Sequence, residues 1–97
     1  MTADLVAYQD GTVVSRTLIK KPAGTVTLFS FDKGEGLSEH TAAFDALVSV
    51  LDGAAEVTIA GRAQRVAAGQ CIIMPGSKPH SLKAVERFKM MLVMIRA

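Results

Sequence analysis

The chain has 97 residues, of which 49% are hydrophobic and only five are Phe or Tyr, and its formal net charge is +2. This length predicts one domain over residues 1–97. The basic residues are scattered and are not interleaved with aromatic side chains, which excludes the usual nucleic-acid-binding surfaces. No apolar run approaches the length of a membrane span, and the single cysteine, Cys71, cannot form an internal disulfide. We therefore expect a cytoplasmic protein with no membrane segment and no nucleic-acid partner.

Short segments of β character follow one another along the whole chain. Residues 5–9 form an apolar run that ends at a turn dipeptide, Asp10-Gly11, and this pattern suits a hairpin with the β-branched run 12–19. Glycine, aspartate and proline separate the later segments, and no stretch predicts a convincing helix. About nine to ten short strands at even spacing predict an all-β barrel or sandwich. The later strands are expected at residues 25–31, 40–51, 55–59, 62–67, 70–74, 80–85 and 87–96.

The C-terminal apolar run from Met90 to Ile95 has two interpretations. It could be a short buried helix or a strand that is apolar on both faces, and periodicity alone does not distinguish them. The flanking β character favours the strand. In so small a barrel, a strand with two apolar faces implies that one face meets another chain. We therefore expect a homodimer.

Two motifs carry the chemically informative residues. In the first, Gly34 is followed after five residues by His40, and Gly53 closes the strand that follows. This spacing resembles the first motif of the cupin family, which has a second histidine and a glutamate where this chain has Ala42 and Ala46. The resemblance therefore lacks two of the four metal ligands that are usual in the family.

The second motif begins fifteen residues after the first one ends. Gly69, Pro75 and His80 keep the spacing of the second cupin motif, while Ser77 and Ala84 stand where that motif has a glycine and an asparagine. Both motifs in the right order are a stronger signal than either alone. The resemblance implies a double-stranded β-helix, or cupin-like jelly-roll barrel, whose motifs line one open end.

The resemblance also implies that His40 and His80 face a common pocket. Side chains on a strand alternate between its two faces, so an unbroken strand places Ala42, Phe44 and Ala46 on the same face as His40. We expect these residues to line a ligand pocket, with Phe44 as part of its wall. The two alanines enlarge that pocket, which suits an organic ligand.

The two histidines are also candidate ligands for a divalent transition metal, since imidazole is the commonest protein ligand for such ions. Two histidines alone hold an ion weakly, so occasional weak binding and no binding both remain open. A β-bulge could turn Asp45 or Glu39 inward as a substitute carboxylate. Cys71 is interpreted as core packing. The methionines are interpreted as flexible core filling in preference to a copper-binding set; they are Met74, Met90, Met91 and Met94.

The function that these observations favour is small-molecule binding in the barrel pocket, with weak or vestigial metal binding through His40 and His80. The alternative is a metal-dependent cupin enzyme, oxygenase-like or isomerase-like, that uses both histidines and a substitute carboxylate. A third reading is a protein that acts only through a partner protein. The sequence identifies neither the ligand nor a reaction.

Overall fold

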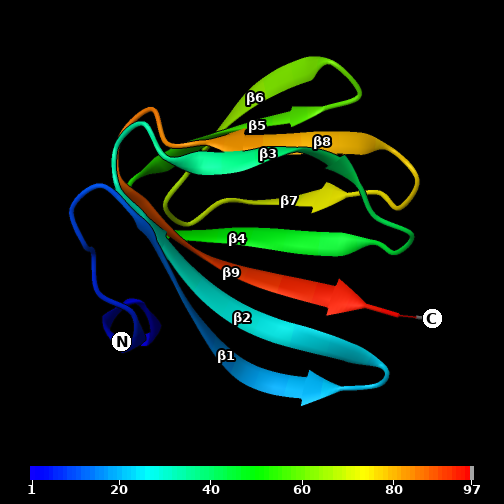
Figure 1. Cartoon of the computed structure of the whole chain (residues 1–97), viewed down its shortest axis with the longest axis horizontal. Coiled ribbons are helices and arrows are strands. Elements are labelled where there is room, and N and C mark those ends of the chain that lie inside the picture. Colours follow the sequence, from blue (N-terminus) through cyan, green and yellow to red (C-terminus); the bar gives the residue numbers. More distant parts are fainter. Residues whose placement is uncertain (97) are drawn as a thin grey trace.

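Two antiparallel sheets pack against each other in the computed structural model, which describes residues 1–96 (Figure 1). Sheet A has five strands in the order β1-β2-β9-β4-β7, and sheet B has four in the order β3-β8-β5-β6. The predicted all-β architecture is confirmed, with nine strands. Sheet A contains β1 (Val13–Lys21), β2 (Gly24–Phe31), β9 (Phe88–Ile95), β4 (Ala46–Asp52) and β7 (Cys71–Met74). Sheet B contains β3 (Gly36–Thr41), β8 (Pro79–Lys83), β5 (Ala54–Ile59) and β6 (Arg62–Ala67).

The core between the sheets is built from small and medium aliphatic side chains around one aromatic stack. The rings of Phe31 and Phe88, on the neighbouring strands β2 and β9, lie almost parallel, 8° apart, with centroids 4.4 Å apart. Val48 from sheet A and Val57 from sheet B are both fully buried in the same cluster. Interdigitation of the two inner faces thus gives this small chain a continuous core.

The C-terminal apolar run is a strand, as predicted. It forms β9, which lies between β2 and β4 in the centre of sheet A. Its inward side chains include Phe88 and Met90, which are fully buried, while the outward ones alternate with them. The strand pairs with β2 along one edge and with β4 along the other, so its alternate residues face the core and the outer side of sheet A.

The prediction of one continuous strand over residues 40–51 is wrong. The segment divides into β3, which ends at Thr41 in sheet B, and β4, which begins at Ala46 in sheet A. Residues 42–45 carry the chain from one sheet to the other (Figure 1). The loop between β7 and β8 fixes this crossing, because the amide of Ser77 donates to the carbonyl oxygen of Ala42 at 2.7 Å. Strict alternation from His40 to Ala46 therefore does not apply.

The predicted hairpin from residues 5–9 is also absent. Residues Thr2–Leu5 form one 3₁₀ turn, and the chain then runs extended until β1 begins. Within residues 1–96, no helix is long and apolar enough to cross a membrane. In the run of residues 5–9, Val6 packs into the protein, with 4% of its surface exposed, whereas Leu5 is exposed.

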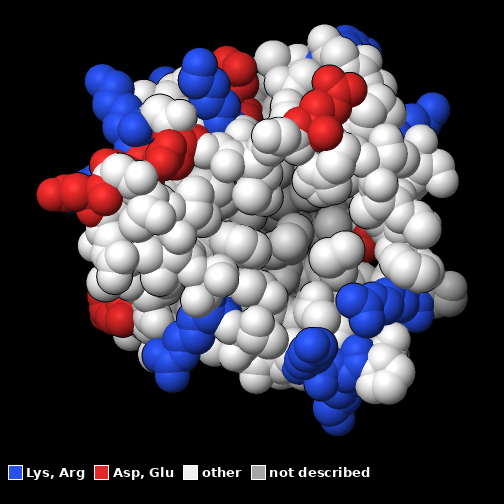
Figure 2. All heavy atoms as spheres, in the orientation of Figure 1, with Lys and Arg blue, Asp and Glu red and all other residues white. Residues whose placement is uncertain are grey.

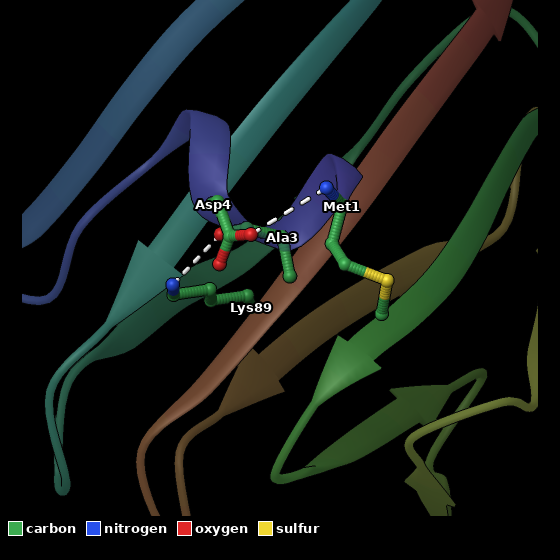
Figure 3. A network of polar contacts seen from close by, with 4 residues as sticks. All are labelled: Met1, Ala3, Asp4 and Lys89. Atoms are coloured by element: carbon green, nitrogen blue, oxygen red, sulfur yellow. Dashed lines mark hydrogen bonds and ion pairs between the residues drawn. The ribbon is translucent and has the colours of Figure 1, made fainter.

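The N-terminal segment covers part of the outer face of sheet A. The buried hydroxyl of Ser30 on β2 donates to the carbonyl oxygen of Ala7 at 2.7 Å. The ammonium of Lys89 on β9 donates to the carbonyl oxygen of Ala3, also at 2.7 Å (Figure 3). An exposed ion pair between the Met1 amino group and Asp4 adds little. These contacts explain how Ser30 can be buried although it faces away from the core.

Gly53, at the end of the first motif, allows a test of how closely the backbone packs at this turn. Its φ of +70° favours glycine, and a Cβ there would collide with the backbone carbonyl of Arg87. Gly61 has a similar φ of +81° but open space around a Cβ, so it is a matched control. We expect Gly61→Ala to lower the free energy of unfolding by about 1–2 kcal/mol. Gly53→Ala should lower the free energy of unfolding by about 1–3 kcal/mol more than Gly61→Ala does, because the backbone at Arg87 must also move.

Urea unfolding of the two variants and the parent measures this difference. Equal losses in the two variants would show that the left-handed conformation alone, and not the close approach to Arg87, requires the motif glycine.

Candidate ligand cavity with a histidine pair

A small, partly enclosed cavity of about 40 Å³ lies between the two sheets. Its walls are apolar except for two imidazoles, and its volume corresponds to roughly three water molecules. Strands of both sheets contribute to it. The lining residues are Leu37, His40, Ala42, Ala46, Met74, His80, Leu82, Met90, Leu92 and Met94.

The two histidines of the chain meet at this cavity. They lie directly opposite each other on β3 and β8, and their Nε2 atoms are 3.0 Å apart. The rings meet edge to face, at 73°. His80 is 2% exposed, whereas His40 is exposed at the outer side of the pair. The structure thus brings together the two side chains that the sequence placed 40 residues apart.

The second nitrogen of each ring lies beside a backbone carbonyl oxygen. Nδ1 of His40 is 2.8 Å from the oxygen of Ser38, and Nδ1 of His80 is 3.2 Å from that of Lys78. A carbonyl oxygen only accepts, so Nδ1 carries the hydrogen when these contacts are hydrogen bonds. Two neutral rings in that tautomer present lone pairs to each other at Nε2. The pair is therefore satisfied only by a proton or another cation between the rings, or by a tautomer change that gives up the longer carbonyl contact.

A proton between the rings is disfavoured near neutral pH. Burial lowers the pKa of His80 below its ordinary value of 6.5, and the neighbouring His40 lowers it further, while the hydrogen bond with Lys78 acts in the opposite direction. Desolvation penalises the charged imidazolium more than the neutral ring. His80 is consequently held as a neutral ring whose nitrogen faces the cavity.

The remaining residues that the sequence suggested for the pocket have different positions. Ala42 and Ala46 line the cavity, as expected from their motif positions. Phe44 lies in the crossing between the sheets, outside the lining, with 36% of its surface exposed. The break between β3 and β4 explains this placement, because Phe44 is not on a strand. Three methionine side chains line the cavity together with the two alanines, and the cavity is small.

Asp45 and Glu39 do not enter the cavity. Asp45 is exposed, and its Oδ1 accepts a hydrogen bond from the amide of Gly76 at 2.7 Å. Its role in the structure is to hold the crossing loop against the loop that follows β7. Glu39 is exposed on β3 beside His40. Neither carboxylate reaches the cavity lining in this arrangement.

The comparisons with known proteins identify the fold. The family model described as the cupin domain matches residues 27–96. The chain belongs to the cupin family. The comparison with curated proteins found no match.

Among solved structures, this cupin resembles a conserved protein of unknown function from Streptococcus pyogenes. The two sequences are 43% identical with a TM-score of 0.89, over 92% of this chain and 78% of the other. A cupin 2 conserved barrel domain protein from Leptotrichia buccalis is 41% identical with a TM-score of 0.94, over 97% of this chain but only 46% of the other. A cupin superfamily protein from Desulfitobacterium hafniense DCB-2 is 27% identical with a TM-score of 0.94, over 98% and 87% of the two chains.

The donor set of this cavity does not fit the carboxylate-containing metal site that the family resemblance implies. Among residues 1–96, no group of three or more His, Cys, Asp or Glu side chains is placed to hold a metal ion. The imidazoles of His40 and His80 are the only such donors in the lining, and Ala46 occupies the carboxylate position. A hard divalent ion prefers oxygen ligands and would find none here among the side chains.

Sequence reasoning missed six lining residues, three leucines and three methionines, and the methionines are Met74, Met90 and Met94. Met90 and Met94 share a parity on β9, so alternation could have placed them on one face together. Nothing in the sequence, however, gives the pairing of β9 with β4 and of β4 with β7, which brings Met74 to the same place. Strand order is a tertiary property, and spacing along the chain does not reveal it.

A second hollow, of about 540 Å³, lies elsewhere, along β6 and β7, which are edge strands of the two sheets. It is open and contains neither histidine. Its lining includes Arg62, Ile72 and Lys78. Although this hollow is larger, the smaller cavity is the better candidate site because the histidine pair lies in its lining.

The depressed pKa of His80 predicts a pH dependence of stability. The unfolded chain, with an ordinary histidine pKa, binds a proton at higher pH than folded His80 does. The stabilising contribution is therefore complete above the unfolded pKa of 6.5 and is lost as the pH falls through 6.5 toward the folded value. Urea unfolding in a chelating buffer at pH 7.5 and 5.5 should show lower stability at pH 5.5.

A His80→Gln variant is the control for this measurement. It should lose less stability than the parent between the same two pH values. An equal fall in both proteins would contradict the assignment to His80.

Proposed function

We propose that this cupin binds a compact polar organic molecule against the His40–His80 pair. The observation that supports the proposal is a hydrogen-bonding pair at one end of an otherwise apolar cavity. A ligand hydroxyl group would donate a hydrogen bond to an Nε2 atom beside the pair, and the aliphatic walls would cover its carbon atoms. Such a combination of apolar walls with a few convergent polar groups is typical of small-molecule sites.

The cavity size restricts the ligand. A space of about 40 Å³ accepts only a few non-hydrogen atoms. Larger ligands require the methionine side chains to move, which their three rotatable bonds allow at modest cost. We therefore place small alcohols and polyols first among the candidates, because a hydroxyl group can donate to the imidazole lone pairs, and short-chain organic acids second. His40, exposed at the outer side of the pair, marks the side from which a ligand enters.

The alternative function is a metal-dependent enzyme of the oxygenase or isomerase type. It would need a third ligand in addition to His40 and His80. Asp45 could supply it only by giving up its hydrogen bond to Gly76, and the crossing loop would then have to rearrange. The binding function is favoured because it uses the cavity as it stands.

We further propose that the protein acts as a homodimer through the outer face of sheet A. One cross-strand row of aliphatic side chains spans all five strands on this face. Its two ends are well exposed, with 50% of Ile19 and 62% of Ile73 accessible. At about 4.8 Å per strand, the row extends roughly 19 Å. The row consists of Ile19, Val26, Val93, Leu47 and Ile73.

A second copy of the chain is the partner that fits this row. The N-terminal segment already covers the neighbouring part of the face, so one bare apolar band remains. The row contains no charged residue, and a two-fold axis through its centre would place it against itself without burying a charge. On the face that Figure 2 shows, uncharged atoms likewise occupy the broad, hollowed centre while charged side chains lie around it.

The ligand proposal can be tested by measuring the thermal unfolding of metal-free protein in the presence of each member of a panel of short organic acids and polyols. A true ligand at a hundredfold excess over its dissociation constant should stabilise the protein by about 2.7 kcal/mol. His40→Ala should abolish this shift because it removes the hydrogen-bonding pair. Ala42→Leu should abolish it as well, because it fills the cavity and leaves both histidines in the chain.

Arg62→Ala, in the separate hollow along β6 and β7, is the control that should retain the shift. A panel without any stabilising member would count against the binding function. A shift that depends on Arg62 and not on His40 would move the ligand site to that other hollow.

The dimer prediction concerns the mass of the protein in solution at micromolar concentration. The parent should sediment as a dimer, and Val93→Glu at the centre of the row should sediment as a monomer because it places charge in the interface. Ile73→Glu, on the exposed edge strand, should have the same effect with less risk to folding. Thr58→Glu, on the outer face of sheet B, should remain dimeric. If the parent protein sediments as a monomer at micromolar concentration, the homodimer proposal is wrong.

A further inference from the structure

The cavity contains a set of sulfur atoms that the binding function does not use. Met94 on β9 and Met74 on β7 are both direct neighbours of Ala46 on β4, one on each side. Met90 lies four residues before Met94 on the same face of β9, and all three methionines line the cavity beside the histidines. Between these two methionines, the residue on β4 is Ala46, whose side chain is only a methyl group.

The charge of the donor set selects among cations. Two neutral imidazoles and the thioethers carry no negative charge, and no carboxylate lies in the lining. The desolvation cost of an ion rises with the square of its charge, so an unpaired divalent ion costs about four times as much as a monovalent one. A buried site of neutral donors is therefore suited to a monovalent cation.

The chemical nature of the donors narrows the choice further. Thioether sulfur is a soft ligand that selects Cu(I), whereas oxygen ligands suit magnesium, calcium and manganese. Imidazole also suits copper. Sodium and potassium, although monovalent, prefer oxygen donors, which the lining does not supply from its side chains. Cu(I) is the cation that matches both the charge and the softness of these donors.

The histidine pair is already close to the geometry that one metal ion requires. Metal–imidazole bonds of about 2.0–2.1 Å at a tetrahedral angle place two nitrogens roughly 3.3 Å apart. The Nε2 atoms of His40 and His80 are 3.0 Å apart, so they need to separate by only a few tenths of an ångström. Their Nδ1 atoms face the carbonyl oxygens of Ser38 and Lys78, which orients the Nε2 lone pairs toward each other.

We propose that the cavity binds one Cu(I) ion through His40, His80 and at least one of the sulfurs of Met74 and Met94. The inference rests on the proposed function only in taking this cavity as the ligand site, and it assigns the site a different class of ligand. The same alanine that removes the carboxylate of the usual family motif leaves the space in which the two methionines can approach an ion.

The test is an anaerobic titration of metal-free protein with Cu(I) in competition with a chromophoric Cu(I) chelator. The parent should bind one equivalent, and X-ray absorption of the complex should show sulfur as well as nitrogen neighbours. Met74→Leu or Met94→Leu should weaken binding by about tenfold or more, as should His40→Ala. Met91→Leu, which changes a methionine on the opposite face of β9, should bind like the parent.

Three outcomes would overturn the inference. They are no Cu(I) binding, equal binding by the Met74→Leu, Met94→Leu and Met91→Leu proteins, or tighter binding of Zn(II) than of Cu(I). The melting temperatures of the ion-free variants show whether each is folded, and leucine preserves the apolar volume. If Cu(I) does not bind while organic ligands still give a shift that depends on His40, this inference fails and the proposed function stands. If Cu(I) binds and no organic ligand does, the proposed binding of organic molecules fails and the Cu(I) inference stands.

Discussion

The crossing of the chain between the two sheets at residues 42–45 is the constraint on which the site depends. It ends β3 just after His40 and starts β4 at Ala46, so one motif contributes to both sheets. The opposing loop holds it through two backbone amides, which reach the carbonyl of Ala42 and the carboxylate of Asp45. That loop also leads into β8 and His80. This contact thus lies next to the pairing of β3 with β8, which sets His40 opposite His80.

This arrangement explains why Asp45 is a structural residue here. A carboxylate that accepts a backbone hydrogen bond at a loop junction is not available to a ligand without loosening the junction. Ser77 has a complementary role, since its φ of +67° is a conformation that favours glycine. The second family motif has a glycine at this position, and the structure shows the reason in backbone geometry. The two loops preserve the family scaffold although Ala42 and Ala46 have changed its chemistry.

The sequence was sufficient to predict the class of fold, the approximate strands and the convergence of His40 and His80. These features follow from local periodicity, turn residues and motif spacing. The sequence did not predict the crossing at residues 42–45, because an alternating apolar pattern does not mark where the chain leaves one sheet for the other. The prediction of a roomy pocket from Ala42 and Ala46 also assumed that nothing would occupy the vacated space. Met74 and Met94 reach that space through strand order, which a pattern along the chain cannot encode.

Strand β9 connects the two proposed surfaces of the protein. Its inward Met94 lines the cavity, and the preceding outward residue, Val93, is the centre of the aliphatic row on sheet A. Side chains on a strand alternate, so a displacement of this backbone moves both residues together. Packing of a second chain on the outer face would restrain β9 and hence the position of Met94. In this architecture, the proposed dimer contact at Val93 and the position of Met94 in the cavity depend on the same strand, β9.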